Sequence, residues 1–174
     1  NKQIDRLVEY ARKYIGTPYR RGSKGPNRFD CSGFMQYIFN HFSYSLNASS
    51  ASQYLQGISV KDEEICRGDL VFFKGRNSRR SNVGHVGLVT EVYPDGRFKF
   101  IHASTSQGIR EDWNFSPYYA QRYVGARRIY FVQIDKRLIL DAILELEDID
   151  DNTPFTETEK SITPQEFSTF VRAE

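Results

Sequence analysis

The chain has 174 residues, of which 39% are hydrophobic, 14% aromatic and 26% charged. This length suits one domain with a substantial core, with or without an extension, and leaves too little chain for two ordinary domains. No apolar run approaches the roughly 18 residues that a membrane-spanning helix needs, so we expect no membrane span.

The net charge of +2 conceals an asymmetry along the chain. Residues 1–134 hold 20 basic and 11 acidic side chains, whereas residues 135–174 hold 4 basic and 11 acidic ones. The basic part would suit an anionic partner, although scattered solvated lysines and arginines give the same count. Since no more than two basic residues are adjacent and no recognition motif accompanies them, we expect no nucleic-acid partner.

Two helices are predicted in the first quarter of the chain, which begins at Asn1 as a processed or trimmed form would. Apolar residues at helical spacing predict an amphipathic helix that ends at Gly16. A Gly- and Pro-containing loop then leads to a second helix, in which Asp30 is the predicted N-cap and Cys31 the first helical residue. The apolar residues are Ile4, Leu7, Val8, Ala11 and Ile15 in the first helix, and Phe34, Met35, Ile38, Phe39 and Phe42 in the second.

Cys31 is the candidate nucleophile because of this position. Unpaired N–H groups and the helix dipole at a helix N-terminus favour the thiolate, which is the form that attacks carbonyl carbons. A small buried core residue is the competing interpretation. The other cysteine, Cys66, is expected to be a structural residue with a free thiol.

Strands follow in the second half of the chain. A turn at residues 67–69 precedes an apolar run at 70–73, a basic loop at 75–82 and a strand at 83–92. The turn at residues 93–96 and the alternating segment 98–102 complete a hairpin, and residues 123–131 form the last predicted strand. Helices followed by an antiparallel sheet indicate the α+β class.

Only three histidines could act as the base that a thiol nucleophile needs. His41 lies about 15 Å from Cys31 by the helical rise, too far to be its partner. His85 lies between glycines that could let a ligand backbone approach, and His102 lies on the partner strand of the hairpin. A two- or four-residue hairpin connection would place the two on one face, and a three-residue connection without a bulge would place them on opposite faces.

A zinc site made of Cys31, His85 and His102 is the alternative chemistry. No paired Cys or His residues at short spacing support it, so we expect no metal and no other cofactor. Residues 135–174 are predicted to form an acidic extension with an apolar segment at 138–146. A capping box that begins at residue 163 predicts a short terminal helix. We expect the apolar segment to dock back on the catalytic body. Contact with a second chain or a neighbouring domain is the rival interpretation, and a partly disordered tail is a further alternative.

Several motifs, in this order, resemble the NlpC-type cell-wall cysteine peptidases, papain-like hydrolases of bacterial peptidoglycan. The resemblance covers about residues 1–131 and implies a catalytic domain over residues 1–134. The matching motifs are Gly16-Thr17-Pro18-Tyr19, Phe29-Asp30-Cys31-Ser32-Gly33-Phe34, Ser50-Ala51-Ser52-Gln53, Gly68-Asp69-Leu70-Val71-Phe72-Phe73, His85-Val86-Gly87 and His102-Ala103-Ser104.

The resemblance implies a role for each matched polar residue. Cys31 would be the nucleophile, His85 the general base, and His102 the residue that orients it. Tyr19 would stabilise the oxyanion together with the Cys31 backbone N–H. Asp30 and Ser32 would help to recognise the polar end of the substrate.

The implied substrate is a peptidoglycan stem peptide, cut at the bond between D-γ-glutamate and a diamino acid, and the implied location is the bacterial cell envelope. Ser23 and Ala48 depart from residues common in the family. A wall-binding module with a decayed active site therefore remains an alternative, as does an amidase or acyltransferase of the same fold.

Overall fold

The computed structural model describes residues 1–130 together with residues 143 and 144. The helices are α1 (Lys2–Arg12), α2 (Cys31–His41), α3 (Ser50–Gln53) and α4 (Pro117–Ala120), with a 3₁₀ turn η1 (Asp62–Glu64). The strands are β1 (Ile58–Val60), β2 (Leu70–Lys74), β3 (Val83–Val92), β4 (Phe98–Ser104), β5 (Gly108–Trp113) and β6 (Tyr123–Arg128). The predictions for residues 135–174, including their boundary at 134, fall outside the described residues apart from those two positions.

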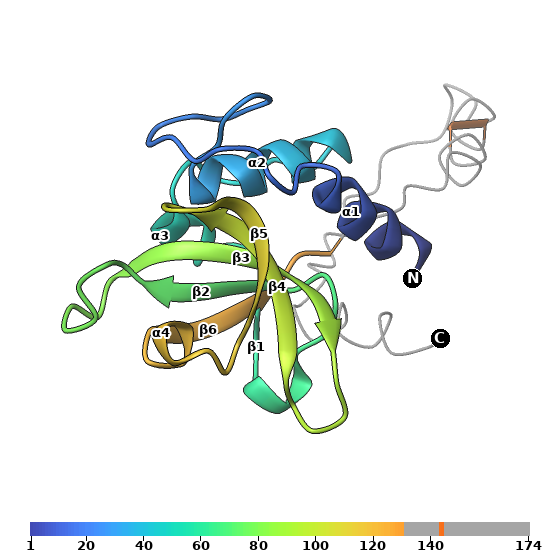
Figure 1. The fold of residues 1–174 in the computed structure, drawn as a ribbon. Coiled ribbons are helices and arrows are strands. Elements are labelled where there is room, and N and C mark those ends of the chain that lie inside the picture. The colour runs from blue at the N-terminus through green and yellow to red at the C-terminus, as the bar shows by residue number, and fades with distance from the viewer. Residues whose placement is uncertain (131–142, 145–174) are drawn as a thin grey trace, which may run out of the picture. The chain divides into compact units, whose positions relative to one another are not determined.

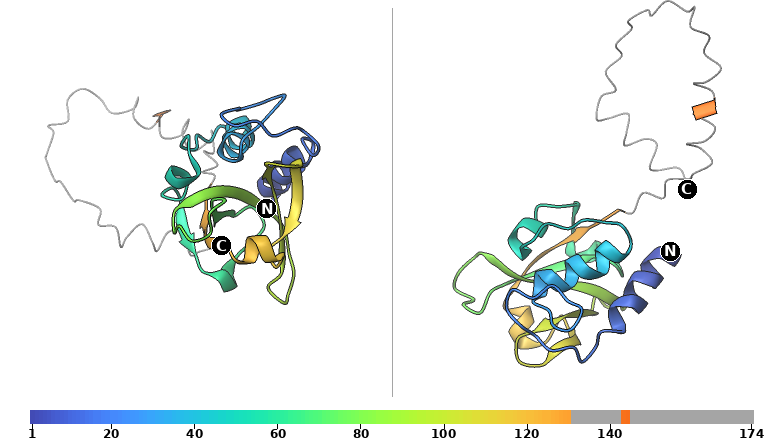
Figure 2. Two further views of the ribbon diagram at one scale, coloured as in Figure 1. Left: turned by 60° about the vertical axis from the view of Figure 1, so that its left-hand side comes forward. Right: turned by 90° about the horizontal axis from the view of Figure 1, so that it is seen from above.

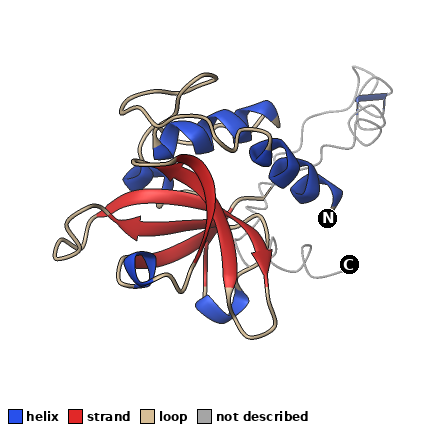
Figure 3. Ribbon diagram, viewed as in Figure 1, coloured by secondary structure: helices blue, strands red, loops and turns tan. Residues whose placement is uncertain are grey.

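The six strands form one antiparallel sheet in the order β1-β6-β2-β3-β4-β5 (Figure 1). The α+β class with N-terminal helices and an antiparallel sheet is confirmed. Helices α1 and α2 lie on one side of the curved sheet (Figures 2 and 3). The alternation of β2 explains why the sheet has two cores, since Leu70 and Phe72 pack with the helices whereas Val71 and Phe73 pack on the opposite face.

Helix α1 is shorter than the apolar pattern predicts. It ends at Arg12, and Ile15 at the end of the predicted stripe is 50% exposed. The chain turns at Gly16, whose φ of 93° is open to glycine and unfavourable for other residues, and the Gly16 N–H donates to the carbonyl of Ile109 at 2.9 Å. This bond to β5 anchors the turn after the helix and directs the following loop toward the start of α2.

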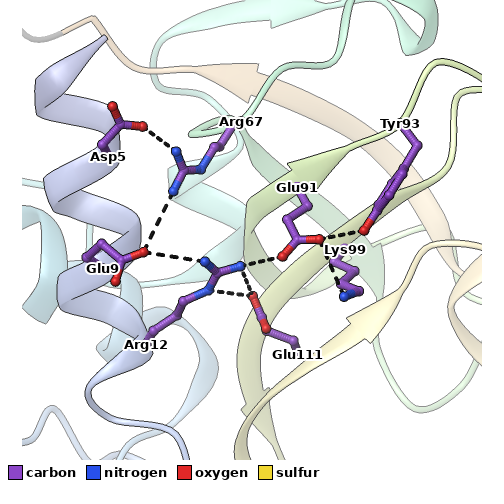
Figure 4. A network of polar contacts seen from close by, with 8 residues as sticks. All are labelled: Asp5, Glu9, Arg12, Arg67, Glu91, Tyr93, Lys99 and Glu111. Atoms are coloured by element: carbon purple, nitrogen blue, oxygen red, sulfur yellow. Dashed lines mark hydrogen bonds and ion pairs between the residues drawn. The ribbon is translucent and has the colours of Figure 1, made fainter.

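A network of charged side chains joins α1 to the sheet (Figure 4). Arg12 donates to Glu91 on β3 at 2.8 Å and to Glu111 on β5 at 3.0 Å. Arg67, just before β2, pairs with Asp5 on the same helix. Because Arg12 is half-buried between two carboxylates, this contact fixes the helix more firmly than an isolated surface ion pair would.

Short elements make up most of what the sequence pattern missed, namely α3, β1, η1, α4 and β5. Strand β5 matters most here because it carries functional-site residues. Only its first two residues are buried, and the following Arg110, Glu111 and Asp112 show no apolar alternation. It is an edge strand next to β4, and its charged residues are satisfied by tertiary contacts that a sequence pattern does not display.

Candidate active site

Cys31 stands where the sequence places it, at the first residue of α2. The Asp30 carboxylate caps this helix, accepting from the Gly33 N–H at 2.6 Å. Its other oxygen accepts from the Gly22 N–H at 3.0 Å, which ties the preceding loop to the helix. The thiol is partly buried, and its sulfur lies 3.9 Å from the carbonyl oxygen of Gly84 at the start of β3. The helix therefore presents the thiol to the end of the sheet.

Tyr19 reaches the same place from the loop before α2. The Phe29 N–H donates to the carbonyl of Pro18 at 3.2 Å, and the Arg20 N–H donates to the carbonyl of Phe29 at 3.0 Å. This pairing holds Tyr19 beside the start of the helix. Burial raises the pKa of the Tyr19 hydroxyl, and the nearby Cys31 and Asp30 add to the effect. The hydroxyl therefore stays protonated and able to donate.

His85 and His102 are brought into direct contact, with His85 Nε2 and His102 Nδ1 2.8 Å apart. The connection of the hairpin differs from the two-, three- and four-residue connections that the sequence analysis considers. Residues 93–97 connect the strands, and a register shift between Val89 and Glu91 changes the pairing by one residue. An odd connection alone would separate the two rings, and the bulge restores them to one face.

The glycines beside His85 have different roles. Gly84 lines the cavity that also contains Cys31, which is compatible with the expected approach of a ligand backbone; close packing also requires glycine there, because a Cβ would lie 2.7 Å from Gly75 Cα. For Gly87 that expectation is wrong, because a Cβ there would lie 2.8 Å from the Phe100 ring and 3.3 Å from His102 Cβ. Gly87 allows β4 to pack closely enough for the two histidines to meet.

Asp112 on β5, which the sequence analysis does not single out, completes the chain of polar contacts. Its Oδ2 lies 2.7 Å from His102 Nε2, and its Oδ1 accepts from Arg110 at 2.9 Å. His102 itself is fully buried. The register His102↔Arg110 between β4 and β5 is what aligns the carboxylate with the ring. Asp112 lies two residues beyond Arg110, the position that pairs with His102. The sequence could indicate this carboxylate only through a predicted pairing of β4 with β5, and the sequence pattern does not predict β5.

The His102–Asp112 and His85–His102 contacts determine the tautomers of both histidines. An ionised carboxylate only accepts, so His102 Nε2 carries its proton toward Asp112. A neutral His102 then has its lone pair on Nδ1, which accepts from His85 Nε2. His85 is left with Nδ1 as the unprotonated nitrogen. The arrangement thus produces an imidazole ready to accept a proton at a defined atom.

Comparison with known proteins identifies the family of this chain. The sequence model of the NlpC/P60 family matches residues 16–128, well over half of the chain. The chain belongs to the NlpC/P60 family. This is a family of cysteine peptidases, so the resemblance carried by the motifs is confirmed.

Two curated relatives and one solved structure illustrate the match. The NlpC/P60 chain is 34% identical to the murein DD-endopeptidase MepS/murein LD-carboxypeptidase of Escherichia coli strain K12, over 71% of this chain and 62% of that protein. It is 33% identical to the gamma-DL-glutamyl hydrolase of Bacillus subtilis, over 75% and 30% respectively. An NLP/P60 protein of Staphylococcus aureus superposes with a TM-score of 0.65 at 30% identity, over 76% and 43%. The chain thus spans less than two thirds of each of these proteins.

The NlpC/P60 domain has a cavity of about 460 Å³ at this place. Tyr19, Cys31, His85 and Asp112 line it together. Asp30 and Ser32 do not: the Asp30 carboxylate is engaged in capping, and Ser32 is buried, with its hydroxyl 3.5 Å from Asp30 Oδ1. Their role in substrate recognition stays a prediction.

The charge state of Cys31 differs from the expectation. Burial raises the pKa of the thiol to about 11, and the charge of Asp30 adds to this. Backbone N–H groups of Cys31 and Ser32 at the helix start, and of Val86 on β3, lower it by a smaller amount, those of the helix in the predicted direction. The helix N-terminus thus acts as predicted, but the predicted thiolate is not the favoured form in the unliganded NlpC/P60 domain, because burial and the charge of the capping Asp30 outweigh it. The thiol needs a base.

The zinc alternative does not fit the NlpC/P60 site. One nitrogen of His85 and one of His102 point at each other in a hydrogen bond, and the second nitrogen of His102 is taken by Asp112. They do not converge on a common point beside Cys31. Among the described residues no group of three metal-ligating side chains occurs.

None of the helices in the described part of the chain is long and apolar enough to cross a membrane.

The buried His102 and the half-buried His85 should make the stability of the NlpC/P60 domain depend on pH. Burial lowers the pKa of His85 to about 3 and also lowers that of His102. In the unfolded chain both protonate near pH 6.5. Below that pH the unfolded state binds more protons than the folded state. The contribution of the two histidines to the free energy of unfolding is therefore fully present above pH 6.5 and is lost as the pH falls. We expect a loss of about 1–2 kcal/mol between pH 7 and pH 5, measured by urea unfolding.

Two variants test the source of this loss. His85→Gln removes one of the titrating groups and should reduce the difference between pH 7 and pH 5. His41→Gln removes an exposed histidine at the end of α2 and should leave it unchanged. An identical pH dependence in His85→Gln and the unaltered protein would contradict the assignment.

Proposed function

We propose that this chain is a cysteine endopeptidase that hydrolyses peptidoglycan stem peptides at the bond between D-γ-glutamate and a diamino acid. The observation that supports it best is the presence of Cys31 and His85 in one cavity, with His85 oriented by the His102–Asp112 pair. The names of the relatives agree, since one is a murein endopeptidase and another a gamma-DL-glutamyl hydrolase. Action in the cell envelope of a bacterium follows from the substrate.

The proposed reaction begins with transfer of the thiol proton of Cys31 to His85 Nδ1 while the sulfur attacks the carbonyl carbon. The neutral state of both groups suits general-base catalysis, in which the proton moves as the carbon–sulfur bond forms. The Tyr19 hydroxyl and the Cys31 backbone N–H would donate to the resulting oxyanion.

The tetrahedral intermediate would then collapse with cleavage of the carbon–nitrogen bond. His85 returns the proton to the leaving amine, which leaves an acyl group on the sulfur as a thioester. A water molecule, activated by the same ring, hydrolyses the thioester and regenerates the thiol. His102 and Asp112 hold the imidazole through both steps and exchange no proton with the substrate.

Mass spectrometry of fragments released from purified peptidoglycan tests the proposed bond. We expect soluble products that end in D-glutamate together with products that begin at the diamino acid. Release of whole stem peptides from the glycan would instead assign an amidase, and cleavage only at the cross-link would assign a different endopeptidase bond. Binding to insoluble wall with no released fragment would favour the decayed wall-binding module.

A further inference from the structure

The cavity that holds Cys31 carries more positive than negative charge. Its charged lining residues are Lys74 at the end of β2, Arg76 in the following loop, Arg110 and Asp112 on β5, and Arg122 just before β6. Four cations thus face one carboxylate. Positive side chains gathered in a partly enclosed site concentrate their field and attract anionic groups.

The single carboxylate does not neutralise these cations. Asp112 is engaged by Arg110 at 2.9 Å and by His102 at 2.7 Å. Among the described residues, no carboxylate pairs with Lys74, Arg76 or Arg122. We call these three residues the basic wall. Its charge remains available to a ligand.

Two side chains of the basic wall, those of Arg122 and Lys74, are held in place before any ligand arrives. The Arg122 guanidinium lies 3.7 Å from the centroid of the Tyr118 ring and donates to the carbonyls of Tyr118 at 3.0 Å and Arg76 at 3.3 Å. Lys74 donates to the carbonyl of Ser78, in the loop that follows β2, at 3.3 Å. Carbonyl partners orient these cations without cancelling their charge, and a preorganised cation loses less entropy on binding.

A γ-linked glutamate brings a suitable anion to this place. When the side-chain carboxyl of glutamate forms the amide, its α-carboxylate stays free, within the length of one side chain of the scissile bond. We propose that the basic wall binds this carboxylate, so that the site selects acidic γ-glutamyl substrates over those in which the carboxylate is amidated. The inference rests on the proposed function, because it takes Cys31 as the attacking group.

Two synthetic peptides that differ only at this carboxylate test the proposal. Each is L-Ala–γ-D-Glu–diamino acid, one with a free α-carboxylate on glutamate and the other with a carboxamide. Isothermal titration with the Cys31→Ala variant of the 174-residue chain measures binding without cleavage. A charge-assisted hydrogen bond is about twice as strong as a neutral one, and we expect about tenfold tighter binding of the free acid.

Variants in one loop separate a local contact from the overall charge. Arg76→Gln in the Cys31→Ala background should reduce the tenfold preference to threefold or less. Arg80→Gln removes the same charge from an exposed residue of this loop that does not line the cavity, and it should preserve the preference. Raising the salt concentration should weaken the preference, because partly exposed charges are screened.

The outcomes distinguish this proposal from the proposed function. Equal affinity for the two peptides, or equal effects of Arg76→Gln and Arg80→Gln, would overturn the carboxylate site. A preference in binding without cleavage of either peptide by the unaltered protein would support the site and overturn the endopeptidase assignment. Cleavage of both peptides with equal kcat/KM and equal affinity would support the endopeptidase assignment and overturn the carboxylate site.

Discussion

Replacing Cys31 by alanine is expected to abolish the release of peptide fragments from purified peptidoglycan, with a loss of about 10⁴-fold or more. The reason is chemical, because alanine has no group that can form the thioester. The fold should survive, since the side chain lies at the first residue of α2 and is only partly buried. We expect the free energy of unfolding to change by about 1 kcal/mol or less.

The second cysteine provides a matched control for this variant. Cys66 is exposed and also has a free thiol. Cys66→Ala should therefore retain full activity. Digestion that continues in Cys31→Ala, or that is lost in Cys66→Ala, would contradict the role of Cys31.

The next largest effect is expected from Asp112→Asn. Asparagine can donate from its amide nitrogen to His102 Nε2, which would reverse the protons along the chain of contacts. His102 Nδ1 would then carry a proton toward His85, and His85 Nδ1 would be protonated in the neutral ring. With the lone pair on the wrong nitrogen, kcat/KM should fall on the order of 10²- to 10⁴-fold.

Alkylation of Cys31 and a variant on the same strand show whether this effect acts through the histidines. The rate at which iodoacetamide alkylates Cys31 at pH 7 should also fall in Asp112→Asn, because His85 no longer accepts the thiol proton. Glu111→Gln removes a neighbouring carboxylate that contacts Arg12 and neither histidine, and its kcat/KM should match that of the unaltered protein. Equal losses in the two variants would indicate general damage to β5.

The sequence by itself determined the elements whose signals are local. The capping Asp30 and the apolar spacing after it predicted α2 and placed Cys31 at its start, because a helix N-terminus depends on contacts within a few residues. Helices before an antiparallel sheet followed from periodicity. The family, and with it the candidates Cys31 and His85, followed from short motifs in a fixed order.

Tertiary structure alone decided how these residues interact. The bulge between Val89 and Glu91 places the rings of His85 and His102 on one face of the sheet, and no local sequence pattern predicts it. Asp112 becomes a partner of His102 only through the pairing of β4 with β5, whose sequence lacks apolar alternation. The pKa of Cys31 is raised because burial and the Asp30 charge outweigh the helix N-terminus. Register, burial and charge balance depend on residues distant in the chain, and their outcome can be known only after the chain has folded.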